Sequence, residues 1–239
     1  RVEVVDIDNY ADAVGSRADV LINANGNSKK FLATEDPALE FDLSVRSVAR
    51  SLRDFACGLY VHLSTIDVYP EHSDTAENAE DAPIDVARLS PYGLHKYLAE
   101  LLVRRLAPQW LILRMGGFVG PGLRKNSVYD LLKGVPLRVH PDSRYQYMPT
   151  SALARIVFEL IGSNRRNEIF NAAGDGLVSL SEIAREIPDC APRLHDVDAP
   201  IETYEVNIGK LKEFTKAPRT LDSVRAFIRD VLAGKAELA

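Results

Sequence analysis

The stretch LSTIDVYP (residues 63–70) ends an apolar run, and SPYGLHK (residues 90–96) follows it along the chain. The first stretch completes a pattern typical of a buried strand, Leu59 to Ser64, with Thr65 directly after it. The second stretch begins an amphipathic helix, Tyr92 to Leu106, with a proline just before it, as is common at helix starts. A strand, a polar loop and a helix in this order indicate one unit of an α/β sheet.

The same alternation of apolar runs and amphipathic stretches continues along the chain. Further strands are predicted at Val2 to Val5, Val20 to Asn23, Trp110 to Arg114 and Glu168 to Asn171. Further helices are predicted at Pro37 to Phe55, Ser151 to Ile161, Leu180 to Glu186 and Thr220 to Leu232. In the first of these helices, the spacing predicts a buried stripe of Ala38, Phe41, Val45, Val48 and Leu52. Strands that alternate with helices predict an α/β fold with a parallel sheet.

The composition argues against several classes of function. The chain has 239 residues, 46% of them hydrophobic and 26% charged, which is enough for a sizeable core. Because 29 Lys and Arg stand against 34 Asp and Glu, the net charge is −5, and nucleic acid is not an expected partner. No apolar run approaches the roughly 18 residues that cross a bilayer, so no membrane partner is expected. The two cysteines, Cys57 and Cys190, favour a reducing, cytoplasmic location, and the scattered histidines predict no metal site.

Tyr92 and Lys96 carry the clearest chemical signal. At positions i and i+4 of a helix they share one face, and an ammonium beside a phenol lowers the pKa of the phenol. Tyr92 would then serve as a general acid or base for a substrate hydroxyl. A Tyr-x-x-x-Lys match alone arises by chance in roughly one chain in three. Thr65 adds to the signal, because its hydroxyl comes directly after a strand, where open parallel sheets bind their ligands.

Several motifs in order resemble the extended short-chain dehydrogenase/reductase family, and within it the nucleotide-sugar epimerase/dehydratase group. The motifs are Val5-Asp6-Ile7, DVLINANG (residues 19–26), LSTIDVYP, SPYGLHK and LRMGGFVGPG (residues 113–122). The stretch YMPTSALARIV (residues 147–157) matches more loosely. The resemblance covers residues 2 to 185 approximately, and the order of the motifs makes it more specific than any single one.

The resemblance implies roles for individual residues. Tyr92 would be the acid or base, Lys96 would hold the nicotinamide ribose, and Thr65 would bond the reacting oxygen. The cofactor, NAD or NADP, would be bound by Lys96 together with Asp6, Ile7, Asn23, Ala24, Asn25, Met115 and Gly116. The substrate would contact Ser64, Gly117, Arg124 and Arg144. A solvated surface is an equal alternative for Arg124.

Some positions depart from the pattern of the family. Ser44 occupies a position where the family has asparagine, and Tyr145 stands where a phosphate-binding arginine is common, with Arg144 beside it. Ile66 and Asp67 replace the Asp and Glu that follow the catalytic threonine in 4,6-dehydratases. Because elimination of water needs an acid/base pair there, the apolar Ile66 argues against a dehydratase.

The resemblance also implies a division of the chain. Residues 1–132 would form a Rossmann-like NAD(P)-binding domain, joined by a strand near residues 168–172, and residues 133–239 would form mainly a smaller substrate-binding lobe. No G-x-x-G-x-x-G turn precedes Asp6, so the strand–helix–strand unit that binds the cofactor pyrophosphate is expected before Arg1. The predicted fold is an α/β, doubly wound parallel sheet of Rossmann type with a smaller C-terminal lobe.

The leading interpretation is an NAD(P)-dependent enzyme for a nucleotide sugar or similar polyol. It would act as an epimerase or, in second place, as a dehydrogenase or reductase of a carbonyl. A non-catalytic nucleotide sensor on the same scaffold is the alternative, and the intact set of Thr65, Tyr92 and Lys96 counts against it. The resemblance further implies a homodimer in which the helices Pro37 to Phe55 and Tyr92 to Leu106 pair across a two-fold axis.

Overall fold

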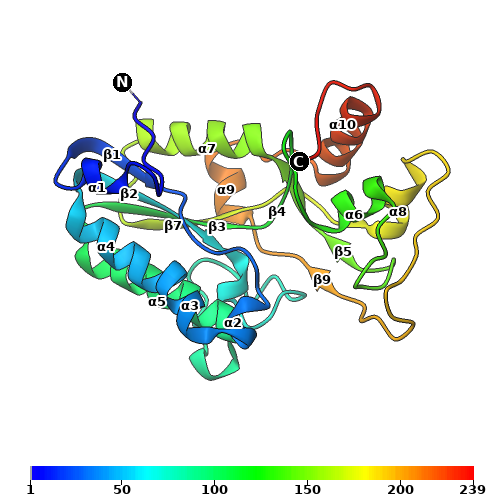
Figure 1. Cartoon of the computed structure of the whole chain (residues 1–239), viewed down its shortest axis with the longest axis horizontal. Helices are drawn as coiled ribbons and strands as arrows, with labels where there is room; N and C mark the ends of the chain where they lie inside the picture. Colours follow the sequence, from blue (N-terminus) through cyan, green and yellow to red (C-terminus); the bar gives the residue numbers. More distant parts are fainter. Residues whose placement is uncertain (1) are drawn as a thin grey trace. The chain divides into compact units, whose positions relative to one another are not determined.

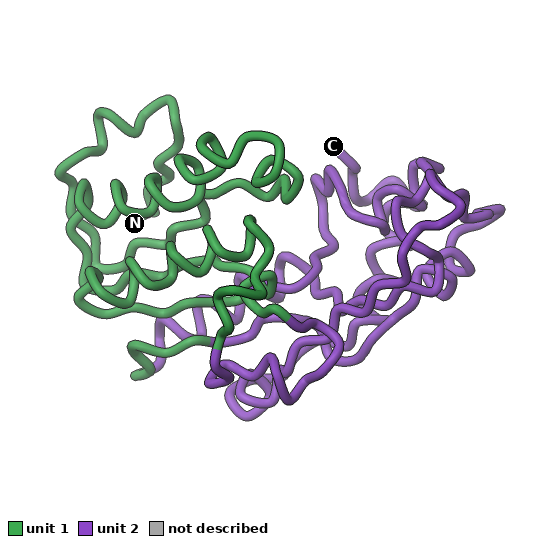
Figure 2. Tube along the Cα trace, turned by 90° about the horizontal axis from the view of Figure 1, so that it is seen from below, with its two compact units in different colours: residues 1–70, 84–114, 164–169 green, residues 71–83, 115–163, 170–239 purple. Residues whose placement is uncertain are grey.

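The computed structural model describes residues 2–239, which divide into two compact units (Figure 2). The first unit contains residues 2–70, Ile84–Arg114 and Asn164–Ile169, and the second contains Glu71–Pro83, Met115–Ser163 and Phe170–Ala239. Each unit has a hydrophobic core of its own. Thr65, Tyr92 and Lys96 all belong to the first unit.

A four-stranded sheet organises the first unit. Its strand order is β1 (Arg17–Asn23), β2 (Ala56–Thr65), β3 (Trp110–Met115) and β7 (Glu168–Ala172). The strands predicted at these four places are confirmed, each somewhat longer in the structure. β1 and β2 run parallel, with Val20 opposite Leu59 and Asn23 opposite His62. The carboxyl ends of β1 and β2 therefore meet at one edge of the sheet.

Two helices pack on one face of this sheet, α4 (Ser47–Asp54) and α5 (Pro91–Leu106) (Figure 1). The core between helices and sheet contains Val48, Tyr60, Ala99, Val103 and Ile112. α5 begins at Pro91, one residue before the predicted start. Ser90 caps it by accepting a hydrogen bond from the Gly93 amide at 3.0 Å, and the proline occupies its first turn.

A π-helical turn interrupts the helix that the sequence predicts over residues 37–55. The chain forms α3 (Pro37–Phe41), then the π turn Asp42–Arg46, and then α4. α3 begins as predicted, because the Asp36 carboxylate accepts a hydrogen bond from the Leu39 amide at 3.0 Å. The extra residue of a π turn rotates α3 by roughly 100° relative to an uninterrupted α-helix.

The π turn changes which side chains face inward. Val45 and Val48 are buried as predicted, but Ala38 and Phe41 are exposed, so the predicted stripe is wrong over α3. Glu40 takes the inward position instead and is fully buried. A regular helical period therefore does not hold across residues 42–46.

The strand predicted at Val2 to Val5 is wrong. Residues 2–6 are irregular and exposed, and the edge strand β1 pairs with β2 within the described part of the chain. Because a strand needs a hydrogen-bonded neighbour, apolar residues alone do not form one here. The first unit also contains α1 (Tyr10–Ala13), α2 (Leu32–Glu35) and the 3₁₀ helices Ile66–Val68 and Val86–Arg88.

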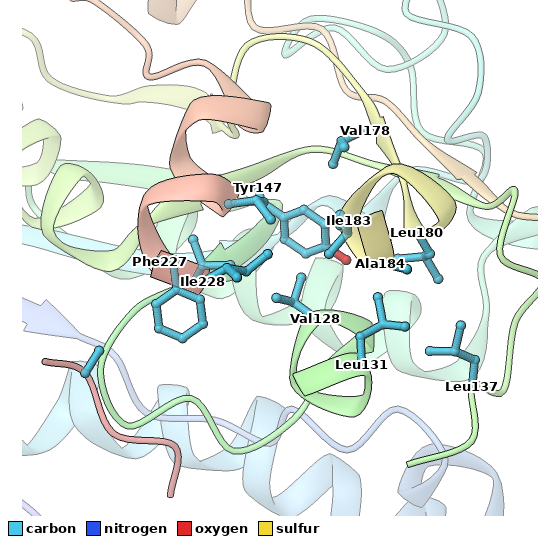
Figure 3. Packing of buried hydrophobic residues seen from close by; sticks show 13 residues of the cluster. Val128, Leu131, Leu137, Tyr147, Val178, Leu180, Ile183, Ala184, Phe227 and Ile228 are labelled. Atoms are coloured by element: carbon cyan, nitrogen blue, oxygen red, sulfur yellow. The ribbon is translucent and has the colours of Figure 1, made fainter. Parts of the chain in front are cut away.

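The second unit is built from short strands and helices. β4 (Gly117–Val119) and β6 (Tyr147–Pro149) pair in parallel, and β5 (Arg144–Tyr145) lies between β8 (Val178–Ser179) and β9 (Thr203–Tyr204). Its helices are α6 (Ser127–Lys133), α7 (Thr150–Gly162), α8 (Leu180–Arg185), α9 (Gly209–Phe214) and α10 (Thr220–Leu232). Tyr147 lies in its core with Val128, Ile183 and Phe227 (Figure 3). α7, α8 and α10 confirm predictions, whereas strands of two or three residues are too short to show a period.

Two negative findings concern residues 2–239 as a whole. None of the helices in this range has both the length and the apolar character needed to cross a membrane. In the same range, no three or more His, Cys, Asp and Glu side chains are grouped so that they could hold a metal ion.

His62 on β2 is a buried titratable residue of the first unit. It is 2% exposed, and neither ring nitrogen has a hydrogen-bond partner among residues 2–239. Burial, together with a smaller effect of the Lys96 charge, lowers the pKa of His62 to about 3. The neutral ring is therefore part of the folded state.

Replacement of His62 by leucine is expected to flatten the pH dependence of stability below pH 6.5. In the wild type, His62 binds a proton near pH 6.5 when the chain is unfolded but only near pH 3 when it is folded. The free energy of unfolding therefore falls by about 1.4 kcal/mol per pH unit as the pH drops through this window. Urea denaturation at a series of pH values measures the slope. His195→Leu, which removes an exposed ring, should keep the wild-type slope, and equal slopes for all three proteins would contradict the prediction.

Candidate active site

Thr65 lies at the carboxyl end of β2, with its hydroxyl held by Asp67. The Thr65 Oγ1 donates a hydrogen bond to Asp67 Oδ2 at 2.8 Å and accepts one from the Asp67 amide at 3.2 Å. Asp67 Oδ1 is also 2.5 Å from Lys30 Nζ, an ion pair. With its proton directed at Asp67, the Thr65 hydroxyl keeps a lone pair free to accept a hydrogen bond.

Tyr92 and Lys96 lie together in the first two turns of α5. The Lys96 Nζ is 5.3 Å from the centre of the Tyr92 ring, over its face. The Tyr92 hydroxyl donates a hydrogen bond to the backbone oxygen of Asn27 at 3.1 Å. Both side chains are buried. The spacing in the sequence therefore predicts their proximity correctly.

Gly93 brings the start of α5 against the residues that follow β2. A Cβ at this position would lie 2.2 Å from the backbone oxygen of Asp67, so only glycine allows this approach. Since Asp67 bonds Thr65, the contact joins Thr65 to the turn that contains Tyr92 and Lys96. The three residues expected to be catalytic are thus gathered at one edge of the sheet.

The segment between β1 and α2, residues 24–30, covers this group and is called here the covering segment. It supplies the Asn27 oxygen that binds Tyr92 and the Lys30 ammonium that binds Asp67. At Gly26, where φ is +146°, a Cβ would lie 2.7 Å from Lys96 Nζ. The covering segment therefore meets all three of Asp67, Tyr92 and Lys96.

The electrostatic environment of Tyr92 and Lys96 differs from the expectation that Lys96 lowers the pKa of Tyr92. Burial, followed by the negative charges of Asp67 and Glu40, raises the pKa of Tyr92 above its ordinary value. Burial lowers the pKa of Lys96, and Glu40 and Asp67 oppose that change. The net shift of the Tyr92 pKa is therefore upward, although the Lys96 ammonium faces the Tyr92 ring. Within residues 2–239, no carboxylate lies within 4 Å of Lys96 Nζ.

Ser64, expected at the substrate, points into a buried network instead. Its Oγ donates a hydrogen bond to Glu100 Oε1 at 2.6 Å. Glu100 accepts three further bonds from Arg114, two from Nε and one from Nη2, which is 2.8 Å from Oε2. Arg114 Nη1 donates to the Tyr69 hydroxyl at 2.8 Å. Arg114 and Glu100 are almost completely buried. Ser64 therefore anchors the end of β2 and does not join the Tyr92 group.

The residues expected to bind the cofactor are only partly brought to this edge. Ala24 and Asn25 are exposed at the end of β1, but the Asn23 side chain is buried and donates a hydrogen bond to the Tyr60 hydroxyl at 2.5 Å. Asp6 and Ile7 lie in an exposed turn, where the Asp6 amide bonds Asn9 Oδ1 at 2.8 Å. The strand that would place Asp6 is absent from the described residues.

Five expected site residues lie in the second unit. The amide of Gly116 bonds the Ala172 oxygen at 3.0 Å, and the amide of Gly117 bonds the Gln146 oxygen at 3.2 Å. Met115 precedes them at the end of β3. Arg124 and Arg144 have exposed side chains, Arg124 in a loop and Arg144 on β5.

Sequence reasoning missed the residues that surround the expected group. From the sequence, Asp67 is noticed only as a departure from a family pattern, and Lys30 is not singled out. Glu40 is fully buried, which a stripe of apolar residues does not reveal. Asp67, a carboxylate two residues after Thr65, is the one signal in the sequence that points to any of these surrounding residues.

Comparison with known proteins identifies the class. An open parallel α/β sheet with a candidate site at the carboxyl ends of its strands is typical of dinucleotide-binding proteins. The model of the NAD dependent epimerase/dehydratase family matches residues 1–140, more than half of the chain. The chain belongs to this family of NAD-dependent enzymes. No curated protein sequence matches the chain.

Solved structures support the fold. The UDP-glucuronic acid 4-epimerase of Bacillus cereus, solved with UDP-glucuronic acid and NAD, is 17% identical with a TM-score of 0.72, covering 89% of this chain and 76% of its own. RMD of Pseudomonas aeruginosa, complexed with NADPH, is 18% identical with a TM-score of 0.69, covering 89% and 81%. The dTDP-glucose 4,6-dehydratase of Bacillus anthracis, complexed with NAD, is 16% identical with a TM-score of 0.69, covering 91% and 74%. At these identities the likeness confirms the Rossmann-like fold.

Replacement of Arg114 by methionine is expected to reduce the free energy of unfolding by about 3–5 kcal/mol, because it leaves the Glu100 carboxylate buried without its cation. The double variant Arg114→Met, Glu100→Leu should recover most of this loss, since no unpaired charge remains. Chemical denaturation of the two variants measures both effects. A single variant as stable as the wild type would contradict the prediction.

Proposed function

We propose that the protein is an NAD(P)-dependent oxidoreductase or epimerase that acts on a hydroxyl-bearing carbon of a nucleotide sugar or a similar polyol. The observation that carries the proposal is the grouping of Thr65, Tyr92 and Lys96 at the carboxyl edge of β1 and β2. A hydroxyl, a phenol and an ammonium within one group supply hydrogen bonding and proton transfer to a substrate oxygen. A nucleotide sensor has no need of them.

The residues around Lys96 fit a dinucleotide cofactor. The Lys96 ammonium is buried, has no carboxylate within 4 Å in the described part of the chain, and lies against Gly26. It is therefore available to hold the hydroxyls of the nicotinamide ribose, and Ala24 and Asn25 are exposed in the same covering segment as Gly26. When bound, NAD or NADP would accept or supply the hydride.

Tyr92 would exchange a proton with the substrate oxygen. Its hydroxyl now donates to the Asn27 oxygen, so a substrate oxygen that replaces this carbonyl receives the same bond. Thr65 would accept a hydrogen bond from a substrate hydroxyl, because its own proton is directed to Asp67. Together they would hold the hydroxyl whose carbon is oxidised and the carbonyl that results.

Reduction of a keto-sugar or another carbonyl is the second candidate. The raised pKa of Tyr92 favours the protonated phenol, which is the form that gives a proton to a carbonyl oxygen. Dehydration has less support, because Ile66 is a buried apolar residue and supplies neither acid nor base. The nucleotide-sugar ligand of the B. cereus epimerase supports the substrate class.

Replacement of Tyr92 by phenylalanine is expected to slow the reaction by at least about 100-fold, because it removes the proton donor and keeps the ring. The protein is first loaded with whichever of NAD and NADP raises its melting temperature. UDP-, dTDP- and GDP-sugars and their 4-keto forms are then added with deuterium-labelled reduced cofactor. NMR follows the appearance of deuterium at the sugar carbons. Tyr97→Phe, on the same helix, should behave like the wild type. If Tyr92→Phe exchanges as fast as the wild type, the proposal fails.

The proposed setting is a cytoplasmic homodimer formed through α3, α4 and α5. Cys57 and Cys190 are both free thiols, as expected in a reducing compartment. Apolar side chains are exposed on these helices and the π turn, and Leu39, Leu43 and Leu101 are 40–45% exposed. A second copy would cover them.

The wild type is therefore expected to sediment as a dimer at micromolar concentration, and Leu101→Lys as a monomer, because a charge at a buried contact opposes association. Val135→Lys, at an equally exposed position in the second unit, should remain dimeric. Analytical ultracentrifugation distinguishes the forms. A monomeric wild type would rule out the dimer.

A further inference from the structure

Glu40 is a carboxylate with no exposure to solvent beside the candidate active site. It lies on α3, just before the π turn, and its two oxygens are both engaged. Oε1 accepts a hydrogen bond from the Ser44 hydroxyl, and Oε2 bonds His95 Nδ1. A buried carboxylate is costly unless it is paired and hydrogen-bonded, so this position is maintained by a specific set of partners.

The partners of Glu40 connect it to the turn that carries Tyr92 and Lys96. His95 immediately precedes Lys96 on α5, and α3 packs against α5 (Figure 1). The ring of Phe41 meets the ring of His95 edge to face at 5.4 Å between centres, which fixes the imidazole beside α3. Glu40, on α3, is thus held against the turn of α5 that carries Tyr92 and Lys96.

The buried Lys96 ammonium is stabilised by negative charges that it does not contact directly. Its ammonium is buried and has no carboxylate within 4 Å among residues 2–239. The charged and titratable groups that act on it from the surrounding elements are Glu40, Asp67, Tyr92 and His62. Asp67 is already offset by the Lys30 ammonium at 2.5 Å, and His62 is neutral. Glu40 is therefore the main buried negative charge on this side of Lys96.

We propose that Glu40 is a positioning residue of the candidate active site: its buried carboxylate, held by Ser44 and His95, is the counter-charge that keeps the Lys96 ammonium protonated over Tyr92. The inference rests on the proposed function only for the role of Lys96. Through Lys96, Glu40 would preserve the cation that holds the cofactor ribose. His95 would serve as a hydrogen-bond donor that fixes the carboxylate.

The test is a titration of Lys96 in the full chain without cofactor or substrate. Protein labelled with ¹³C-lysine is followed by the Cε shift, and Lys96→Arg assigns the signal. In Glu40→Gln, which keeps the shape and removes the charge, the pKa of Lys96 is expected to fall by about one unit or more. Glu35→Gln, at an exposed position on α2, should leave it unchanged.

His95→Asn separates charge from packing. The asparagine amide can still donate to Glu40, but any positive charge at this position is lost, so the pKa of Lys96 should stay or rise. A fall in Glu40→Gln with no fall in His95→Asn supports the proposal. An unchanged pKa in a folded Glu40→Gln, or an equal fall in both variants, overturns it. Because no reaction is measured, this outcome is independent of whether the proposed function holds.

Discussion

The buried ion pair between Arg114 and Glu100 is the interaction on which the first unit depends. It joins β3 to α5, and through Ser64 and Tyr69 it also fixes the end of β2. Glu100 is one turn beyond Lys96 on α5, and Lys96 is one turn beyond Tyr92, so the pair anchors the helix that carries the phenol and the ammonium. An ion pair of this kind adds little net stability, but its hydrogen-bond geometry allows one position of the helix on the sheet.

The covering segment places the protein's own groups where the proposed function would place a substrate. The Asn27 oxygen takes the hydrogen bond of Tyr92, and the Lys30 ammonium takes the charge of Asp67. A substrate that takes the place of the Asn27 oxygen would have to supply an equivalent acceptor for Tyr92.

Part of the fold and of the site follows from sequence, because local patterns determine it. β2 and α5 are set by an apolar run and by a capped amphipathic helix, and their order places Thr65 near Tyr92. The direction of a side chain at the end of a strand does not follow from the local sequence. Ser64 and Thr65 are neighbours with similar hydroxyls, yet one bonds the buried Glu100 and the other bonds Asp67. That choice depends on Arg114, which lies far along the chain, and no local pattern contains it.

The π turn at Asp42–Arg46 gives this stretch a constraint on length as well as on composition. Removal of a single residue there would restore a regular α-helix and turn Glu40 away from His95, while Val45 and Val48 could keep their places in the core. Such a deletion would leave the fold and its apolar pattern nearly intact and still separate the buried carboxylate from the helix beside it. The contact between Glu40 and His95 therefore depends on the number of residues in this helix, a dependence that single substitutions do not reveal.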